Sequence, residues 1–162
     1  MTSIHVLGAG TPTPTPNRFG AAFVVKTGSD QIMLDCGPAA THKLVKSGLW
    51  PTNINHLFFT HHHFDHDIDY PCFLLCRWDQ STGKEDILKV YGPKLTEQIT
   101  RGILDKEEGL FAHDWIARVN HPLSQRCRWR YLDTCLSRQA RDLSFCSPSH
   151  IELKQSLSSP SR

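Results

Sequence analysis

Residues 60–67, in the order Thr-His-His-His-Phe-Asp-His-Asp, concentrate side chains that bind metal ions. Three imidazoles, His61, His63 and His66, and one carboxylate, Asp65, lie close together in this run. They directly follow the apolar run Leu-Phe-Phe, which predicts a loop at the end of a buried strand. Nitrogen and oxygen ligands at this density suit a borderline-soft divalent ion such as zinc.

The spacing of these ligands suits two ions. In an extended segment, residues two apart project to the same side, so His61 and His63 can hold one ion while His62 faces away as a bystander. Asp65 and His66 are then placed to reach a second ion. Two ions roughly 3.5–4 Å apart can share a water and clamp a phosphoryl or acyl oxygen, with Asp65 as general base. The alternative is a solvated histidine-rich loop, or a run like a histidine tag, with weak metal affinity. Histidine tags are usually terminal and uniform, whereas this run is internal and contains aspartate.

The run from Thr60 to His66 resembles the metallo-β-lactamase superfamily, whose hallmark T-H-x-H-x-D-H it matches at every defined position. The resemblance implies that His61 and His63 bind one zinc ion and that Asp65 and His66 bind another, with manganese or iron as alternative metals. It also implies hydrolysis by a hydroxide that the two metal ions activate, with Asp65 as the catalytic base.

A second pattern of the superfamily lies at residues 34–37, where Leu-Asp-Cys-Gly matches the sequence L-D-x-G that follows the third strand. Here the resemblance gives Asp35 the role of orienting the ligand imidazoles from behind. A plain turn or helix-capping aspartate is the alternative.

The N-terminus resembles the ribonuclease Z and arylsulfatase-like branch of the superfamily. Residues 7–12 (Leu-Gly-Ala-Gly-Thr-Pro) match its G-x-G-x-P loop, and residues 91–93 (Tyr-Gly-Pro) also fit this branch. The resemblance implies that Thr11 and Arg18 help to position an anionic substrate beside the metal ions. An exposed arginine on a surface loop is the alternative for Arg18.

The chain is predicted to begin with a hairpin and then to alternate strands and helices, which indicates an α/β fold with a mixed sheet. Short apolar runs predict strands at 3–7, 21–26, 31–34, 55–59 and 87–91. Apolar periodicity and end signals predict helices at 39–47, 68–78, 94–104 and 111–119. The resemblance implies that these elements form the N-terminal half of a metallo-β-lactamase-like αββα sandwich, a mixed β-sheet with flanking helices.

Composition changes near residue 125. Residues 1–125 hold 11 Lys and Arg against 13 Asp and Glu, whereas residues 126–162 hold 7 against 3. We therefore predict a metallo-β-lactamase-like half over residues 1–125 and an atypical Arg- and Ser-rich tail over residues 126–162. A shifted reading frame or gene-model error that replaces the native second half is one origin of this tail, and a genuine C-terminal helix is the other. Residues 156–162 are predicted to be disordered.

The complete site of the superfamily needs three further ligands, two histidines and a bridging aspartate, from later in the chain. Only His113, His121 and His150 follow the motif. The first two are predicted to be surface residues, and His150 lacks a strand-end context. Two protein ligands per ion are fewer than the usual three or so, so we expect a C-terminally truncated chain of low metal affinity. The missing second sheet would expose one face of the first, which predicts self-association or a homodimer.

Bulk properties limit the remaining classes. The net charge of +2 at pH 7 provides no strong field for nucleic acids or membranes, and no apolar run approaches the roughly 20 residues of a bilayer span. We expect no signal peptide at the N-terminus. The six cysteines are irregularly spaced, and Cys72 and Cys76 are expected on one helix face, so reduced thiols and a cytoplasmic location are predicted.

The leading functional prediction is a metal-dependent hydrolase of an anionic ester, specifically a phosphodiesterase of the ribonuclease Z type that processes tRNA 3′ ends. RNA is then the expected partner, and no membrane partner is expected. A sulfatase, a cyclic-nucleotide phosphodiesterase or another ester hydrolase of the same superfamily is the enzymatic alternative. The non-enzymatic alternative is an inactive truncated fragment that binds metal weakly.

Overall fold

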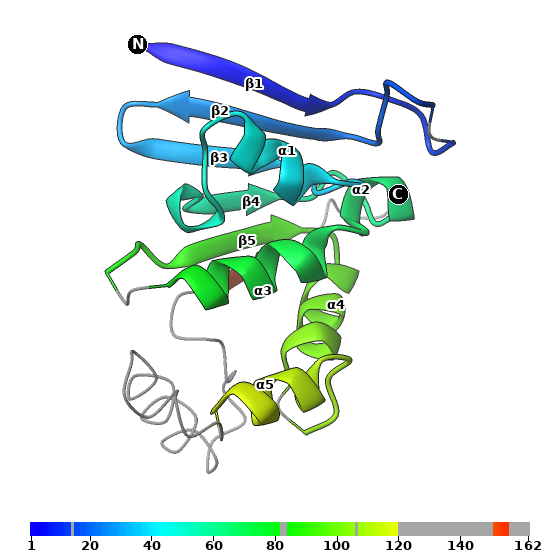
Figure 1. The fold of residues 1–162 in the computed structure, drawn as a ribbon, viewed down its shortest axis with the longest axis vertical. Coiled ribbons are helices and arrows are strands. Elements are labelled where there is room, and N and C mark those ends of the chain that lie inside the picture. Colours follow the sequence, from blue (N-terminus) through cyan, green and yellow to red (C-terminus); the bar gives the residue numbers. More distant parts are fainter. Residues whose placement is uncertain (14, 82–83, 106, 120–150, 156–162) are drawn as a thin grey trace, which may run out of the picture.

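The computed structural model describes residues 1–13, 15–81, 84–105, 107–119 and 151–155. In this part of the chain, a six-stranded mixed sheet carries the strands in chain order from one edge to the other (Figure 1). The strands are β1 (Thr2–Gly8), β2 (Ala22–Thr27), β3 (Asp30–Leu34), β4 (His56–Phe58), β5 (Leu88–Gly92) and β6 (Ile151–Gln155). The first three form an antiparallel meander, and β3 to β6 run parallel to one another.

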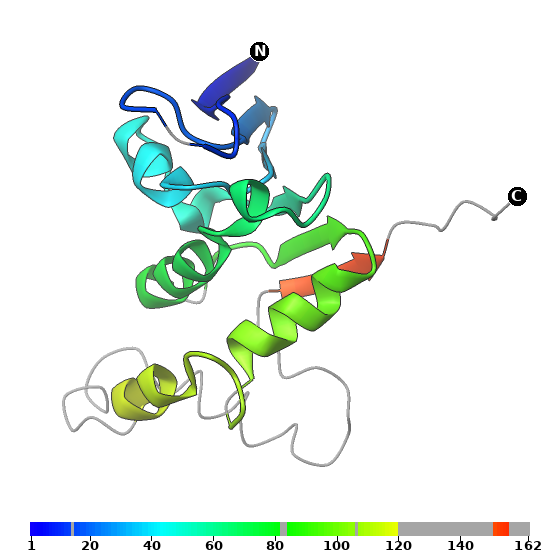
Figure 2. The same ribbon diagram turned by 90° about the vertical axis from the view of Figure 1, so that its right-hand side faces the viewer.

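The helices follow or connect these strands. They are α1 (Ala40–Lys46), α2 (Phe64–Asp67), α3 (Tyr70–Gln80), α4 (Leu95–Leu104) and α5 (Ala112–Val119), with the short 3-10 helix η1 (Pro51–Asn53). The helices α1 and α3 cover one face of the sheet (Figures 1 and 2). None of the helices in the described ranges combines the length and hydrophobicity that a bilayer crossing requires.

Two glycines end elements where the backbone turns to a positive φ. Gly28 has a φ of 59° in the turn that sets Thr27 of β2 opposite Asp30 of β3. Gly48 has a φ of 78° directly after α1 and its C-cap residue Ser47. A side chain is strained at such angles, so glycine fixes where the hairpin turns and where the helix stops.

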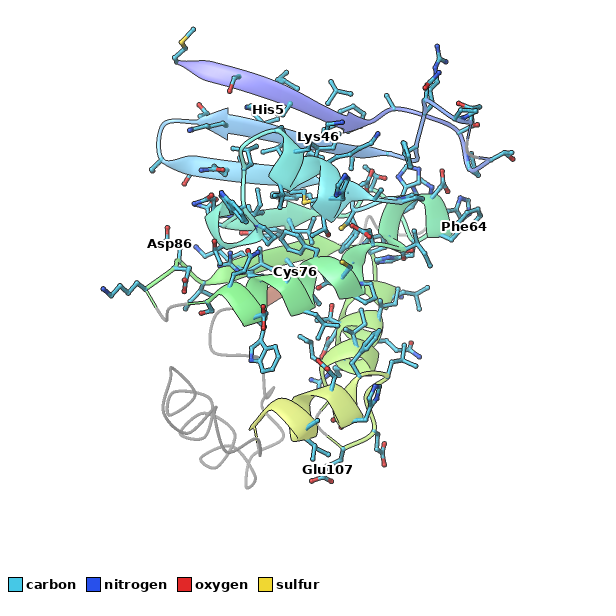
Figure 3. The ribbon with its side chains drawn as sticks, in the orientation of Figure 1. His5, Lys46, Phe64, Cys76, Asp86 and Glu107 are labelled. Carbon is cyan, nitrogen blue, oxygen red and sulfur yellow. The ribbon has the colours of Figure 1, made fainter. Side chains whose placement is uncertain are left out.

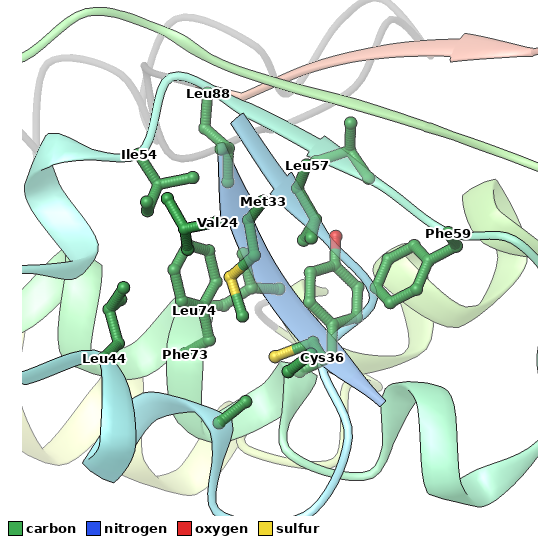
Figure 4. Close-up of a cluster of buried hydrophobic side chains, with 14 of the residues drawn as sticks. Val24, Met33, Cys36, Leu44, Ile54, Leu57, Phe59, Phe73, Leu74 and Leu88 are labelled. Atoms are coloured by element: carbon green, nitrogen blue, oxygen red, sulfur yellow. The ribbon is translucent and has the colours of Figure 1, made fainter. Parts of the chain in front are cut away.

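The hydrophobic core lies between the sheet and the helices α1 and α3 (Figure 4). Alternate residues of the central strands point into it, so Val24, Met33 and Leu57 are fully buried. Leu44 from α1 and Phe73 from α3 fill the same cluster. Burial of a side chain of this size contributes about 1.5–3 kcal/mol. The core therefore holds β3 and β4 in place, and the candidate site begins where these two strands end.

The opposite face of the sheet also carries apolar side chains, and several are exposed. Ile4 and Val6 on the edge strand β1 are 68% and 63% exposed. Phe58 of β4 stacks on Tyr91 of β5 with 4.3 Å between ring centroids. This face is therefore partly open in the described ranges, as the sequence predicted, whereas self-association through it stays a prediction.

All the predicted strands and helices are present, with ends that differ by at most two residues. The loop predicted for the whole histidine run is wrong in the second half of the run, because residues 64–67 form the single helical turn α2. The His66 amide donates to the His63 carbonyl at 2.8 Å, and the Cys36 amide donates to the His66 carbonyl at 2.6 Å. Cys36 lies just after the neighbouring strand β3, and its hydrogen bond stabilises a turn that is too short to show helical periodicity in the sequence.

The tail contributes a strand that the sequence analysis did not predict. β6 pairs with β5 in parallel, with Leu88 opposite Ile151 and Gly92 opposite Gln155. Its sequence, Ile-Glu-Leu-Lys-Gln, alternates apolar and polar residues as a strand does. Residues 126–150, as well as the predicted disorder at residues 156–162, lie outside the described ranges.

Candidate functional site

The candidate site is built where the neighbouring strands β3 and β4 end. The two strands are parallel, with Leu34 paired to Phe58, so their carboxyl ends meet at one edge of the sheet. Asp35 follows β3 directly, and its amide donates to the Phe58 carbonyl at 2.8 Å. The histidine run follows β4. Residues 25 to 31 positions apart in the chain are thereby brought into direct contact.

Two of the predicted ligands, His61 and His63, face each other. Nε2 of His61 lies 3.1 Å from Nδ1 of His63. Two nitrogens bound to one tetrahedral zinc ion at 2.0–2.1 Å would stand about 3.3 Å apart. The third imidazole, His66, lies beside them, with 4.0 Å between its ring centroid and that of His61. The structure therefore brings the three histidines together, as the motif predicted.

Asp65 is the buried acid of the site. The residue is 4% exposed, and its Oδ2 lies 3.5 Å from Nε2 of His66. Its Oδ1 is buried and has no hydrogen-bond partner among the described residues. An unpaired buried carboxylate oxygen is costly and uncommon in folded proteins. The carboxylate is thus prepared for a cation or a proton donor that approaches between Asp65 and His66.

One carboxylate, that of Asp35, fixes the tautomer of two imidazoles. Its Oδ2 lies 2.8 Å from Nδ1 of His66, and its two oxygens accept from the amide and hydroxyl of Thr60 at 2.8 and 2.9 Å. The Thr60 hydroxyl in turn lies 3.0 Å from Nδ1 of His61. Because a carboxylate only accepts, Nδ1 of His66 donates, and because the Thr60 proton points to Asp35, Nδ1 of His61 donates to Thr60. In neutral rings, both Nε2 atoms then carry a lone pair, and that of His61 faces Nδ1 of His63.

Two glycines let neighbouring segments approach the helix α2 closely. A Cβ added to Gly20 or to Gly37 would clash with the carbonyl oxygen of Asp65. Gly20 ends the N-terminal loop, and Gly37 belongs to the L-D-x-G pattern. The glycines therefore allow both segments to pack against the turn that carries Asp65.

The structure does not join Thr11 and Arg18 to this cluster. Both residues are exposed on the N-terminal loop. The Thr11 hydroxyl donates to the Thr13 carbonyl at 3.0 Å, and the backbone of Arg18 pairs with that of Thr15. Within the described ranges, no hydrogen bond links either side chain to the histidine run. Their role toward a substrate stays a prediction.

Of the other histidines, those that the sequence analysis considered fall into three groups. His62 points away from the cluster, and its nitrogens are bound to Asp67 and Thr96, which the sequence analysis did not anticipate. His113 is exposed on α5, as predicted. His121 and His150 lie outside the described ranges.

The donor set fits metal ions in residue type and in nitrogen orientation, but only as two pairs. His61 and His63 form one pair, and Asp65 with His66 forms the other. Among the described residues, no group of three or more His, Cys, Asp or Glu is arranged to hold one ion. Each pair would need further ligands from water, substrate or another segment. Phe64 of α2, labelled in Figure 3, belongs to the same run and is 58% exposed.

Solved structures have a similar fold. Human tRNase Z, short form, is 32% identical, with a TM-score of 0.55 over 64% of this chain and 38% of that chain. The metallo-β-lactamase fold protein YhfI from Bacillus subtilis is 23% identical, with a TM-score of 0.55 over 62% of this chain and 42% of that chain. The chain has the metallo-β-lactamase fold. The fold class predicted from the sequence is confirmed.

The curated relatives of this metallo-β-lactamase-fold chain include ribonucleases Z. That of Mycolicibacterium paratuberculosis is 29% identical over 75% of this chain and 42% of its own length. That of Methanocaldococcus jannaschii is 34% identical over 60% of this chain and 30% of its own length. A family model described as anti-Pycsar protein Apyc1 matches residues 2–71. The chain spans less than half the length of these ribonucleases Z, so their activity is a proposal for it.

Proposed function

We propose that this chain carries one half of the active site of a metal-dependent phosphodiesterase of the ribonuclease Z type, with tRNA 3′ ends as substrate. The observation that supports this most directly is the buried Oδ1 of Asp65, which has no hydrogen-bond partner in the described part of the chain and lies in the same run as three clustered imidazoles. The likeness to ribonucleases Z at the level of sequence supports the substrate class. Residues 1–125 are then the catalytic half of known type, and residues 126–162 are an atypical addition.

In this proposal, His61 and His63 hold one ion and Asp65 and His66 hold the other. Zinc suits the mixed nitrogen and oxygen donors best, and manganese or iron is the alternative. When bound, such ions lower the pKa of water and polarise a phosphoryl oxygen. The protein's own contribution is to hold the ring protons of His61 and His66 on Nδ1 through Thr60 and Asp35.

Asp65 has a second role as the general base. Its buried carboxylate would take the proton from the attacking water on Oδ1, the oxygen that no described residue occupies. Thr11 and Arg18 on the neighbouring loop would meet the anionic substrate. The loop reaches the site through the close approach of Gly20 to Asp65.

A second candidate function follows from the pairwise arrangement of the donors. Two protein ligands per ion give weak binding, so the chain would be a metal-binding domain without turnover that becomes active only with further ligands. The exposed Ile4 and Val6 would then mark the face through which a second copy associates. Sedimentation of the full chain over a range of concentrations tests that association.

The deciding experiment measures metal content and turnover on the same preparation of the full chain. The substrates are precursor tRNA, bis(p-nitrophenyl) phosphate, a cyclic nucleotide and p-nitrophenyl sulfate. About two zinc ions with phosphodiester turnover supports the enzyme, and turnover of the sulfate ester alone supports a sulfatase. Bound metal without any turnover supports the second candidate.

The matched variants are Asp65→Asn, His63→Ala and the control His113→Ala, which removes an exposed histidine far along the chain on α5. Turnover should be lost in the first two and kept in the control. Turnover that survives in Asp65→Asn and His63→Ala would sink the assignment.

A further inference from the structure

His62 occupies the variable position between two proposed ligands, yet its ring is turned away from them and is buried. Its side chain is 4% exposed. Nδ1 lies 3.0 Å from Oδ2 of Asp67, and Nε2 lies 2.7 Å from the hydroxyl of Thr96 on α4. The Asp67 carboxylate only accepts, so Nδ1 donates to it, and Nε2 of the neutral ring accepts from Thr96. Both nitrogens are thus engaged by protein groups.

The backbone of the Tyr-Gly-Pro pattern brings Thr96 into reach. The Thr96 amide donates to the Pro93 carbonyl at 2.9 Å, which places the hydroxyl at the start of α4. A Cβ on Gly92 would clash with that hydroxyl and would lie 3.1 Å from Cβ of Phe59. Glycine at position 92 is therefore what allows the hydroxyl to stand beside the histidine run.

The contact continues into the core. Thr100 donates to the Thr96 carbonyl at 2.7 Å, and the Tyr70 hydroxyl lies 3.0 Å from that of Thr100. Tyr70 packs edge-on against Phe59 at 4.8 Å between centroids, and Phe59 packs against His62 at 5.1 Å. His62 itself contacts Phe59, Asp67 and Thr96. Thr100 and Tyr70 reach it only through Thr96 and Phe59.

We propose that His62 is a positioning residue, and that its bond to Thr96 fixes the direction in which His61 and His63 project. In an extended segment, neighbours of an anchored residue must point to the opposite side. This bond between His62 and Thr96, called the tether below, therefore holds the two imidazoles at the observed 3.1 Å separation before any ion binds. Fewer side-chain conformations then have to be given up when the ion binds. The inference rests on the proposed function, because it takes His61 and His63 to be metal ligands.

The test compares Thr96→Val with Thr100→Val in the full chain. Both replace a buried threonine on α4, 4% and 0% exposed, by an isosteric residue without the hydroxyl. Only the first removes the bond to His62. Thr96→Ser restores the hydroxyl and is the rescue variant.

The first readout is hydrogen exchange of the metal-free protein. Amides of residues 60–66 should exchange faster in Thr96→Val than in Thr100→Val, and Thr96→Ser should restore protection. The second readout is metal binding, with zinc measured by competition with a chromophoric chelator and cobalt by its visible spectrum. Thr96→Val should lose about tenfold or more in affinity and shift the cobalt bands, and Thr100→Val should do neither.

The two readouts separate the possible failures. Equal exchange in both valine variants would overturn the positioning role, whatever the metal result. If the unchanged protein binds neither zinc nor cobalt while Thr96→Val still loosens residues 60–66, the proposed function fails and the tether stands. Loosening without any loss of affinity would overturn the claim that the tether prepares the ligands.

Discussion

Oδ2 of Asp35 accepts a hydrogen bond from Nδ1 of His66 at 2.8 Å, although the two residues are 31 positions apart in the chain. The side chains are 4% and 18% exposed, so water competes little for the contact. The bond places the ring proton on Nδ1 and leaves the Nε2 lone pair facing Asp65. The end of β3 thereby prepares a ligand nitrogen on the loop that follows β4.

Replacement of Asp35 by asparagine should weaken zinc binding by about 10- to 100-fold. The amide can donate as well as accept, so it no longer fixes the tautomer of His66 or the hydroxyl direction of Thr60. Asparagine tolerates the φ of 59° found at this position, so the backbone should be kept. Competition with a chromophoric chelator measures the change.

The control for that variant is Asp79→Asn, which changes an exposed aspartate on α3 with the same loss of charge. Its zinc affinity should stay within about twofold of the unchanged protein, since surface charges contribute little. Equal affinities for the two variants would contradict the role given to Asp35.

Ala39 is strained, and glycine should relieve the strain. It caps α1 with a φ of 59°, a left-handed conformation that costs a residue with a Cβ about 1–2 kcal/mol. Glycine in the unfolded chain offsets part of this gain. Ala39→Gly should therefore stabilise the protein by roughly 0.5–1 kcal/mol, measured as the free energy of unfolding in urea.

The matched control is Ala40→Gly, one residue further along. Ala40 is the first residue of α1 and is fully buried. Glycine there adds backbone freedom and removes a buried methyl group, so this variant should lose about 1 kcal/mol or more. Destabilisation by both changes would show that Ala39 is not strained.

Asp69 should make stability depend on pH. Burial raises the pKa of Asp69 above its ordinary value of 3.8, although hydrogen bonds from Thr41 act in the opposite direction. The folded state then holds the proton more tightly than the unfolded state. The stability from this group is full below pH 3.8 and is lost as pH rises through the raised pKa.

Asp69→Asn removes that titration and keeps an oxygen for the Thr41 amide, which now donates to Oδ2 over 2.6 Å. The variant should therefore gain stability relative to the unchanged protein at neutral pH and lose this advantage in acid. Urea unfolding at several pH values gives the difference. A stability difference that does not vary with pH would contradict the raised pKa.

Much of the fold could be predicted because strong local signals coincide with it. Three of the five apolar runs end directly before a residue that breaks a strand, Gly8, Asp35 or Gly92, and all five runs form strands. The short turn α2 could not be predicted, because a single turn is held by the contact from Cys36 rather than by its own periodicity. The strand β6 carries an alternating pattern, but the change of composition after residue 125 hid it.

The site was predictable to a different extent for each residue. The spacing of His61 and His63 determines that they face each other, since this follows from backbone alternation alone. The bonds of His62 and Thr60 depend on which segments meet at the strand ends, and no local pattern specifies that. A useful signal was the glycine of the Tyr-Gly-Pro pattern, which marks a close approach.

The thiols of α3 should differ in reactivity, although Cys72 and Cys76 lie one turn apart with their sulfur atoms 3.9 Å apart. Cys72 is exposed. Burial, and to a lesser extent the charge of the neighbouring Cys72 thiolate, raises the pKa of Cys76 to about 11. At about pH 8, roughly one Cys76 thiol in a thousand is then the reactive thiolate. Cys76 is labelled on α3 in Figure 3.

Among the three cysteines that the structure describes, iodoacetamide should therefore modify Cys72 first, Cys76 slowly, and Cys36 only on unfolding, because burial also raises the pKa of the Cys36 thiol. Fragment-ion mass spectrometry of the peptide that carries both α3 thiols resolves the order. In Cys72→Ser, Cys76 should react faster, since one of the groups that raise its pKa is gone. Modification of Cys76 as fast as Cys72 in the unchanged protein would show that the helix face is more open to solvent than the structure places it.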